Sequence, residues 1–138
     1  MKNKNISIAV IIIILILFGI FFAVNNKYKN TPLEPVNTLI NVLYFNKGTY
    51  DDYKNIFTKP SNAFKEKDFN EFRKNPNKKQ FIYGSNSSSE IMKHVKSEVN
   101  GNNGTVYYLK NINSKNEIKS AFSWKVEKVN GKWLLKNN

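Results

Sequence analysis

Residues 118–136 read IKSAFSWKVEKVNGKWLLK, and this stretch is the strongest indication of the fold. From residue 118 to residue 127, apolar or small side chains on one face alternate with mostly polar side chains on the other, which is the period of a strand with one buried face. Asn130-Gly131 is typical of a two-residue type I′ turn between antiparallel strands. Counting outward from this turn places Lys128 opposite Trp133. The stretch therefore predicts a β-hairpin that closes a sheet.

Further strands are expected on the N-terminal side of this hairpin. Residues 105–112 are β-branched and aromatic, as strands prefer. Residues 91–99 carry Ile, Val and Val on one face of an alternating run, which predicts another strand. Segments 101–104 and 113–116 are rich in turn residues. Together these patterns predict an antiparallel meander of three or four strands.

Helices are expected before the strands. Apolar residues over 36–45 follow the spacing of one helix face, and Gly48 is expected to end that helix. A second short helix is predicted over 49–57, with Thr49 as its N-cap and acidic residues in its first turn. A third helix, over 61–75, would turn its phenylalanines inward. Helices followed by strands predict an α+β domain.

The N-terminal segment Ile6–Val24 is apolar apart from Ser7. As a helix its 19 residues would be about 28 Å long, close to the hydrocarbon thickness of a bilayer. The alternative is a cleaved signal peptide, whose apolar region is shorter and ends at an A-x-A-like site. Here Ala23 is preceded by bulky Phe21 at the position where a small residue is needed. We therefore predict an uncleaved transmembrane anchor.

Basic residues on the two sides of this segment predict its orientation only weakly. Lys2 and Lys4 precede it, and Lys27 and Lys29 follow it. A short tail that stays in the cytoplasm is the common arrangement, so we expect a single-pass protein of the cell membrane whose C-terminal domain lies outside the cytoplasm. The predicted parts are a tail over 1–5, an anchor over 6–24, a linker over 25–36 and an extracytoplasmic α+β domain over 37–138.

Composition limits the chemistry. The 138 residues contain no cysteine and one histidine, which excludes disulfides, thiolate sites, cysteine nucleophiles and histidine-based metal cages. The formal net charge is +12, with 22 basic and 10 acidic residues. Asparagine and lysine occur 23 and 21 times, the pattern expected of an AT-rich genome such as that of a low-GC Gram-positive bacterium. Part of the positive charge is then a consequence of codon bias.

The segment GTYDDY at 48–53 and the segment FSWKVEKVNGKWLL at 122–135, in this order, resemble the nuclear-transport-factor-2-like (cystatin-like cone) superfamily. The resemblance spans about residues 36–137 and implies helices packed on the concave face of a curved antiparallel sheet. An anchor joined to such a domain is similar to small exported proteins of Gram-positive bacteria, and less closely to the bitopic scaffold subunits of conjugative type IV secretion channels. Because this fold hosts enzymes, carriers and scaffolds, it does not decide function.

No catalytic constellation is apparent in the sequence. His94 is placed on a predicted strand, where Glu90 and Glu98 would be roughly 13 Å away, so we expect an exposed, unpaired histidine. Asp51 and Asp52 are expected to complement the dipole of their helix rather than to form a dyad. We therefore predict no enzyme activity, no cofactor and no metal.

Two sets of residues are candidates for binding. The first would line a pocket inside the cone: Phe45, Tyr108, Phe122 and Trp124. The second is the least diluted basic segment, expected either to be a solvated surface or to attract anionic lipid or anionic wall polymers: Arg73, Lys74, Lys78 and Lys79. Nucleic acid is not expected as a partner, because no RNA-binding motif is present and the lysines are spread along the chain.

The function expected from these patterns is non-enzymatic. A membrane-anchored extracytoplasmic domain would act through contact with a protein partner, as an accessory or scaffold component of a secretion, conjugation, exclusion or immunity system. The alternative is an exported binding module that holds a small apolar ligand in the cone pocket. An enzyme would need a buried carboxylate beside His94.

Overall fold

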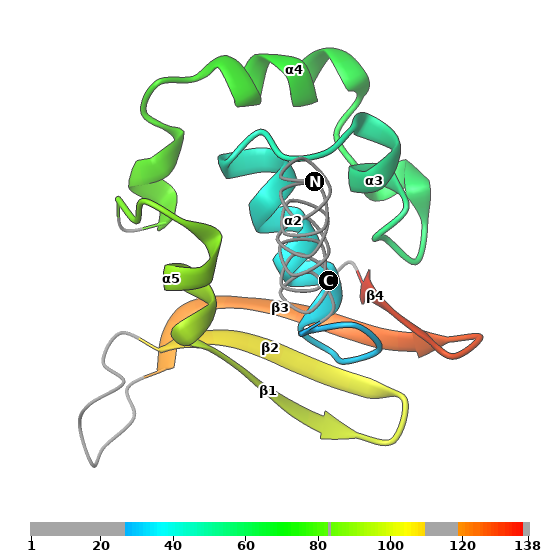
Figure 1. The fold of residues 1–138 in the computed structure, drawn as a ribbon. Coiled ribbons are helices and arrows are strands. Elements are labelled where there is room, and N and C mark those ends of the chain that lie inside the picture. Colours follow the sequence, from blue (N-terminus) through cyan, green and yellow to red (C-terminus); the bar gives the residue numbers. More distant parts are fainter. Residues whose placement is uncertain (1–26, 83, 110–118, 137–138) are drawn as a thin grey trace, which may run out of the picture.

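A computed structural model describes residues 27–82, 84–109 and 119–136 (Figure 1). The predicted anchor over 6–24 lies outside the described residues. None of the helices in the described ranges is long and apolar enough to cross a membrane. The chain forms an α+β fold in which a four-stranded antiparallel sheet carries its helices on one side, and the predicted class is confirmed at this level.

Six helices or helical turns precede four strands in the described chain. The helical elements are α2 (Glu34–Tyr44), α3 (Tyr50–Lys54), η1 (Pro60–Asn62), α4 (Glu66–Lys74), η2 (Lys78–Ile82) and α5 (Ser88–Lys93). The strands are β1 (Val95–Asn100), β2 (Asn103–Leu109), β3 (Lys119–Val129) and β4 (Lys132–Lys136). Helix α2 lies between the sheet and α4, so the described chain has three layers (Figure 1).

The sheet is a meander in the order β1-β2-β3-β4. The predicted hairpin is confirmed: Asn130 and Gly131 have φ values of 49° and 81°, both positive as a type I′ turn requires. Lys128 pairs with Trp133, in the predicted register. The pleat then puts Val106, Trp124, Val126 and Leu135 on the face that meets the helices.

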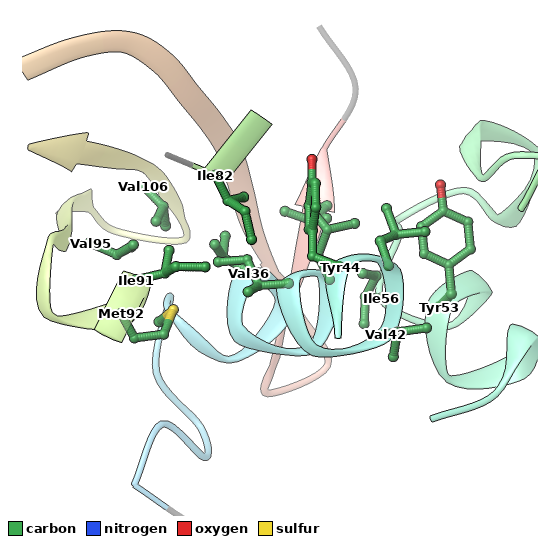
Figure 2. Packing of buried hydrophobic residues seen from close by; sticks show 14 of the residues in the cluster. Val36, Val42, Tyr44, Tyr53, Ile56, Ile82, Ile91, Met92, Val95 and Val106 are labelled. Carbon is green, nitrogen blue, oxygen red and sulfur yellow. The ribbon is translucent and has the colours of Figure 1, made fainter. Parts of the chain in front are cut away.

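Helix α2 organises the core. Its apolar positions are spaced as predicted, and Val36, Ile40 and Val42 are almost completely buried. Figure 2 shows that Val36 lies near residues of α5, β1 and β2, whereas Val42 and Tyr44 lie toward the α3 end. The helix therefore links two halves of one hydrophobic cluster. Burial of this face, rather than intrinsic helix propensity, is the main source of its stability.

The strand predicted over 91–99 is wrong in its first half. Residues 88–93 form helix α5, and β1 begins only at Val95. Ser87 caps the helix, because its side chain accepts a hydrogen bond from the backbone N–H of Glu90 at 3.2 Å. Ile91 and Val95 are four residues apart, a spacing that fits a helix face as well as alternation. The serine cap decides in favour of the helix.

The short helix predicted over 49–57 ends earlier, at Lys54. Its predicted N-cap is confirmed: Thr49 and Asp52 form a reciprocal capping box. After a short turn, Phe57 forms an isolated parallel bridge with Leu135 of β4. The Thr58 N–H donates to Leu135 O at 2.9 Å, and the Leu135 N–H donates to Ile56 O at 2.7 Å. This bridge covers the edge of β4 at Leu135, which would otherwise be open to another chain.

The helix predicted over 61–75 is broken into the turn η1 and helix α4. Phe69 of α4 is buried as expected, and Phe72 packs against the core. Phe64 lies before α4 rather than within it, and 44% of its surface is exposed. The expectation that all three phenylalanines point inward is therefore wrong for Phe64.

Candidate functional site: an aromatic cleft

A network of aromatic rings joins α3 and α4 to the core. The ring of Tyr53 lies at its centre, 5.1 Å from Phe69, 5.3 Å from Phe57 and 5.9 Å from Phe64 between ring centroids. Phe72 meets Tyr44 of α2 edge to face at 5.5 Å. These separations are in the range where aromatic pairs add about 0.5–1.5 kcal/mol beyond their buried area.

Two tyrosine hydroxyls hold the segment before α4 in place. Tyr50 donates its hydroxyl proton to Phe64 O at 2.9 Å, and the Phe64 N–H donates to the Tyr53 hydroxyl oxygen at 3.2 Å. The backbone of Phe64 is thus bonded on both sides, while its ring stays partly in solvent. The arrangement presents an aromatic side chain on a fixed backbone.

A cleft of about 320 Å³ lies between this aromatic network and the β3–β4 hairpin. Its helical wall contains Leu39 and Leu43 of α2, together with Tyr53 and Phe64. Trp124 of β3 is half-buried and lines the opposite wall. The remaining described lining residues are Tyr44, Phe57, Asn62, Ser123, Lys125, Leu135 and Lys136. The cleft is thus mainly aliphatic and aromatic, with a few polar groups.

The polar groups of the cleft suit recognition better than proton transfer. Burial raises the pKa of Tyr44 and of Tyr53 above the ordinary value of 10.0, so both phenols are neutral at physiological pH. The nearby Tyr53 further raises the pKa of Tyr44. None of the described residues lining the cleft is an aspartate, glutamate or histidine. Across the described ranges, no cluster of three such residues could hold a metal ion.

The predicted pocket residues are not gathered in one cavity. Trp124 lines the cleft. Tyr108 is 7% exposed and belongs to the core. Phe45 follows α2, packs against the core and carries the Lys79 ammonium 5.4 Å from its ring centroid. The side chain of Phe122 lies outside the described residues. Among the predicted residues whose side chains are described, only Trp124 faces the cleft.

His94 has a structural position that differs from the predicted exposed strand site. It caps the end of α5, and its ring stacks on Tyr108 with centroids 5.1 Å apart and planes 9° apart. Its Nδ1 is 3.1 Å from Leu109 O. A carbonyl can only accept a hydrogen bond, so Nδ1 carries the proton in this contact. The histidine joins α5 to β2.

Two of the four predicted basic residues tie down the turn after α2. The Arg73 guanidinium donates to Asn46 Oδ1 at 3.2 Å, to Asn46 O at 3.0 Å and to Gly48 O at 3.2 Å. The Lys78 ammonium donates to the same Asn46 Oδ1 at 2.7 Å and also to Arg73 O. Asn46 has a positive φ of 57°, so these hydrogen bonds hold a residue in the left-handed backbone conformation.

Lys78 is a buried cation whose described partners are all neutral oxygens. Only 7% of its surface is exposed. Burial lowers its pKa below the ordinary 10.5, and the neighbouring charges of Arg73 and Lys79 lower it further. Lys74 and Lys79 remain exposed. Of the predicted basic surface, only these two residues are therefore readily accessible to an anionic surface.

Sequence patterns do not identify most of the cleft. Its walls come from α2, the segment 53–64 and the end of the hairpin, which are far apart along the chain. Leu39 and Leu43 are predicted only as core residues of an amphipathic helix. The one available signal was the density of aromatic residues over 50–72, which includes Tyr53 and Phe64.

No family model, curated protein or solved structure matches the chain. The resemblance to the nuclear-transport-factor-2-like superfamily therefore stays a prediction. The features of the chain that bear on function are the geometry of the cleft, the charge around it and the apolar N-terminal segment.

Proposed function

We propose that this protein is a membrane-anchored, non-enzymatic recognition domain whose aromatic cleft receives an apolar side chain of a protein partner. The observation that carries this proposal is the open cleft lined by Trp124, Phe64 and Leu43. Partly exposed aromatic side chains around a concavity are typical of sites where a few contacts supply most of the binding energy. The tyrosine hydrogen bonds that fix the backbone of Phe64 favour a site formed before its partner arrives.

In this proposal the segment over 6–24 is the anchor and the domain over 37–138 lies outside the cytoplasm. Its apolar length supports a spanning helix, and Lys2 and Lys4 support a cytoplasmic tail. The domain would be a cone-like member of the nuclear-transport-factor-2-like superfamily, with α2 on the concave face of the sheet. A role in secretion, conjugation, exclusion or immunity is consistent with a recognition domain in this place.

The exposed lysines Lys74 and Lys79 are proposed to contact an anionic surface. From residue 25 onward the chain has 20 basic and 10 acidic residues, so it carries a charge of +10. Such a domain next to a membrane is attracted to anionic lipid headgroups or anionic wall polymers. This attraction would orient the domain at the surface, while the cleft would select the partner.

A small apolar ligand is the second candidate for the cleft. The volume of about 320 Å³ supports it, because small-molecule pockets start at about 300 Å³. A ligand of this kind would be found with the isolated protein by native mass spectrometry. A partner's side chain would instead be lost when the partner is removed.

Site-specific photo-crosslinking in living cells tests the proposal. A benzoylphenylalanine placed at position 64 of the full-length chain should give one discrete crosslinked product with a protein that mass spectrometry identifies. The matched control is position 129, where Val129 is also exposed, at 38%, but lies at the far end of the hairpin. Equal products from both positions, or none from position 64, would rule out the cleft as the partner's site.

A further inference from the structure

The charges around the cleft carry an inference about the partner. Lys125 and Lys136 line the cleft and are direct register partners on β3 and β4. Like charges directly opposite each other on a sheet destabilise it. On the helical side, Lys59 and Lys65 flank the segment that supplies Asn62 and Phe64, and both lysines are exposed.

Little negative charge compensates these lysines. Lys136 pairs with Glu127 at 3.4 Å. Lys125 donates only to the Thr105 hydroxyl, at 3.0 Å, and no carboxylate pairs with it anywhere in the described chain. Lys59 and Lys65 also have no carboxylate partner within the described ranges. The apolar cleft is therefore bordered by an excess of positive charge.

The two strand lysines also border a second hollow. This neighbouring depression, of about 470 Å³, shares Lys125 and Lys136 with the cleft, and its other polar lining residues are Glu98, Asn100, Asn103 and Thr105. Glu98 supplies this hollow with one carboxylate, but a chain that leaves the cleft along the two lysines would meet mainly ammonium, amide and hydroxyl groups. Carboxylates are the groups that such donors bind best.

We infer that the cleft binds an acidic peptide segment, in which an apolar side chain that fills the cleft is flanked by aspartate or glutamate. The inference rests on the proposed function, since it names the chemistry of the partner at the same site. The apolar residue supplies most of the affinity. The flanking carboxylates pair with Lys125 and Lys136, relieve their mutual repulsion and speed the encounter with a strongly basic domain.

Peptide titration of the full-length chain in phosphatidylcholine nanodiscs tests the inference. The probes are acetyl-Asp-Leu-Phe-Glu-amide and its neutral counterpart acetyl-Asn-Leu-Phe-Gln-amide, and NMR of the Trp124 indole reports binding in the cleft. We expect the acidic peptide to bind about five-fold more tightly at low salt, as one or two exposed ion pairs provide. At 0.5 M salt the difference should nearly vanish, because the charges are then screened.

Matched variants separate pairing at the site from general attraction to a basic protein. Lys125→Met keeps the aliphatic stem and should remove most of the five-fold difference in affinity. Lys125→Arg keeps the charge and should retain the difference. Lys132→Met removes the same charge from the same hairpin, outside the cleft lining, and should leave the difference intact.

Three other outcomes would contradict the acidic preference or the cleft itself. If both peptides shift the Trp124 signal with equal affinity, the acidic preference is wrong and the cleft remains a binding site. If Lys132→Met weakens the acidic peptide as much as Lys125→Met does, the preference reflects net charge alone. If neither peptide at millimolar concentration shifts Trp124, the proposed function of the cleft itself fails.

Discussion

At the scale of single residues, the clearest feature is Lys78, a buried cation that stabilises a turn. Lys78 and Arg73 both bond to Asn46, and together they hold the turn that leads from α2 to α3. A buried lysine without a carboxylate partner in the described chain destabilises the fold when it is charged. In return, its ammonium satisfies the Asn46 side chain and a carbonyl group of α4.

The burial of Lys78 predicts that the stability of the fold depends on pH in the alkaline range. Because burial lowers the pKa of Lys78 in the folded protein, the unfolded chain binds more protons, and the free energy of unfolding should rise as the pH increases from 8 to 10. Above pH 10 the raised pKa values of Tyr44 and Tyr53 should lower the free energy of unfolding, because the folded protein then binds more protons than the unfolded chain. Lys78→Met should flatten the rise, measured by urea unfolding at each pH.

The control for the alkaline dependence is Lys74→Met, which removes an exposed cation from α4. It should leave the slope between pH 8 and pH 10 unchanged. A slope that survives in the Lys78→Met variant would show that the burial of this lysine is not its source.

The turn also depends on Gly48. Its φ is +116°, and a Cβ atom there would lie 2.8 Å from Val42 Cγ2 and 3.1 Å from Asp52 Oδ2. Gly48→Ala should therefore lower the free energy of unfolding by about 1–3 kcal/mol, measured by thermal or urea unfolding. Gly84→Ala is the matched control, because Gly84 has a φ of +67° and no atom within 4 Å of the added Cβ. It should cost about 1 kcal/mol for backbone strain alone, and equal losses would refute the steric argument.

At the scale of elements, α4 is attached to the rest of the fold by aromatic rings. Phe69 is 1% exposed and contacts the rings of Tyr50 and Tyr53. The other face of this short helix carries charged side chains and has little to bury. Its position therefore depends on a few rings and on the hydrogen bonds from Arg73 to the turn after α2, and the rings also support the wall of the cleft that Phe64 forms.

Truncation of these rings should separate stability from binding. Phe69→Ala should cost about 3–5 kcal/mol, as expected for a buried phenylalanine. Phe64→Ala should cost roughly 1 kcal/mol or less, because much of its ring is already in water. Urea unfolding measures both values. If Phe64→Ala were as destabilising as Phe69→Ala, Phe64 would be a core residue rather than the rim of a binding site.

At the scale of the whole molecule, the decisive arrangement is a basic domain joined to an apolar segment. The linker carries exposed Lys27 and Lys29 within the first described turn, so trypsin should cleave there without unfolding the domain. On intact cells we expect trypsin to release the domain into the medium, since the proposed location is outside the cytoplasm.

Lysed cells give the reference for this experiment. Cleavage only after lysis would place the domain in the cytoplasm, would refute contact with wall polymers and would make nucleic acid the leading partner for so basic a chain. A Lys27→Gln, Lys29→Gln double variant should resist release and shows that the cleavage is in the linker.

Local sequence alone determined the final hairpin, its register, the apolar face of α2 and the Thr49 cap, although α2 ends at Tyr44 rather than next to Gly48 as expected. Each of these depends on residues close together along the chain, so periodicity and turn chemistry were sufficient. The same local signals were ambiguous at residues 91–94, where strand and helix spacings coincide and the cap at Ser87 favours the helix.

The cleft and the burial of Lys78 depend on long-range packing and could not be predicted from local sequence. The cleft brings Leu43, Phe64 and Trp124 together from segments far apart in the sequence. Local periodicity does not indicate contacts between such distant segments. Lys78 lies in a lysine-rich run that looks like a solvated surface, but the turn at Asn46 offers it oxygen acceptors. Long-range packing determines which side chains share a surface, and it therefore determined where this protein has a site.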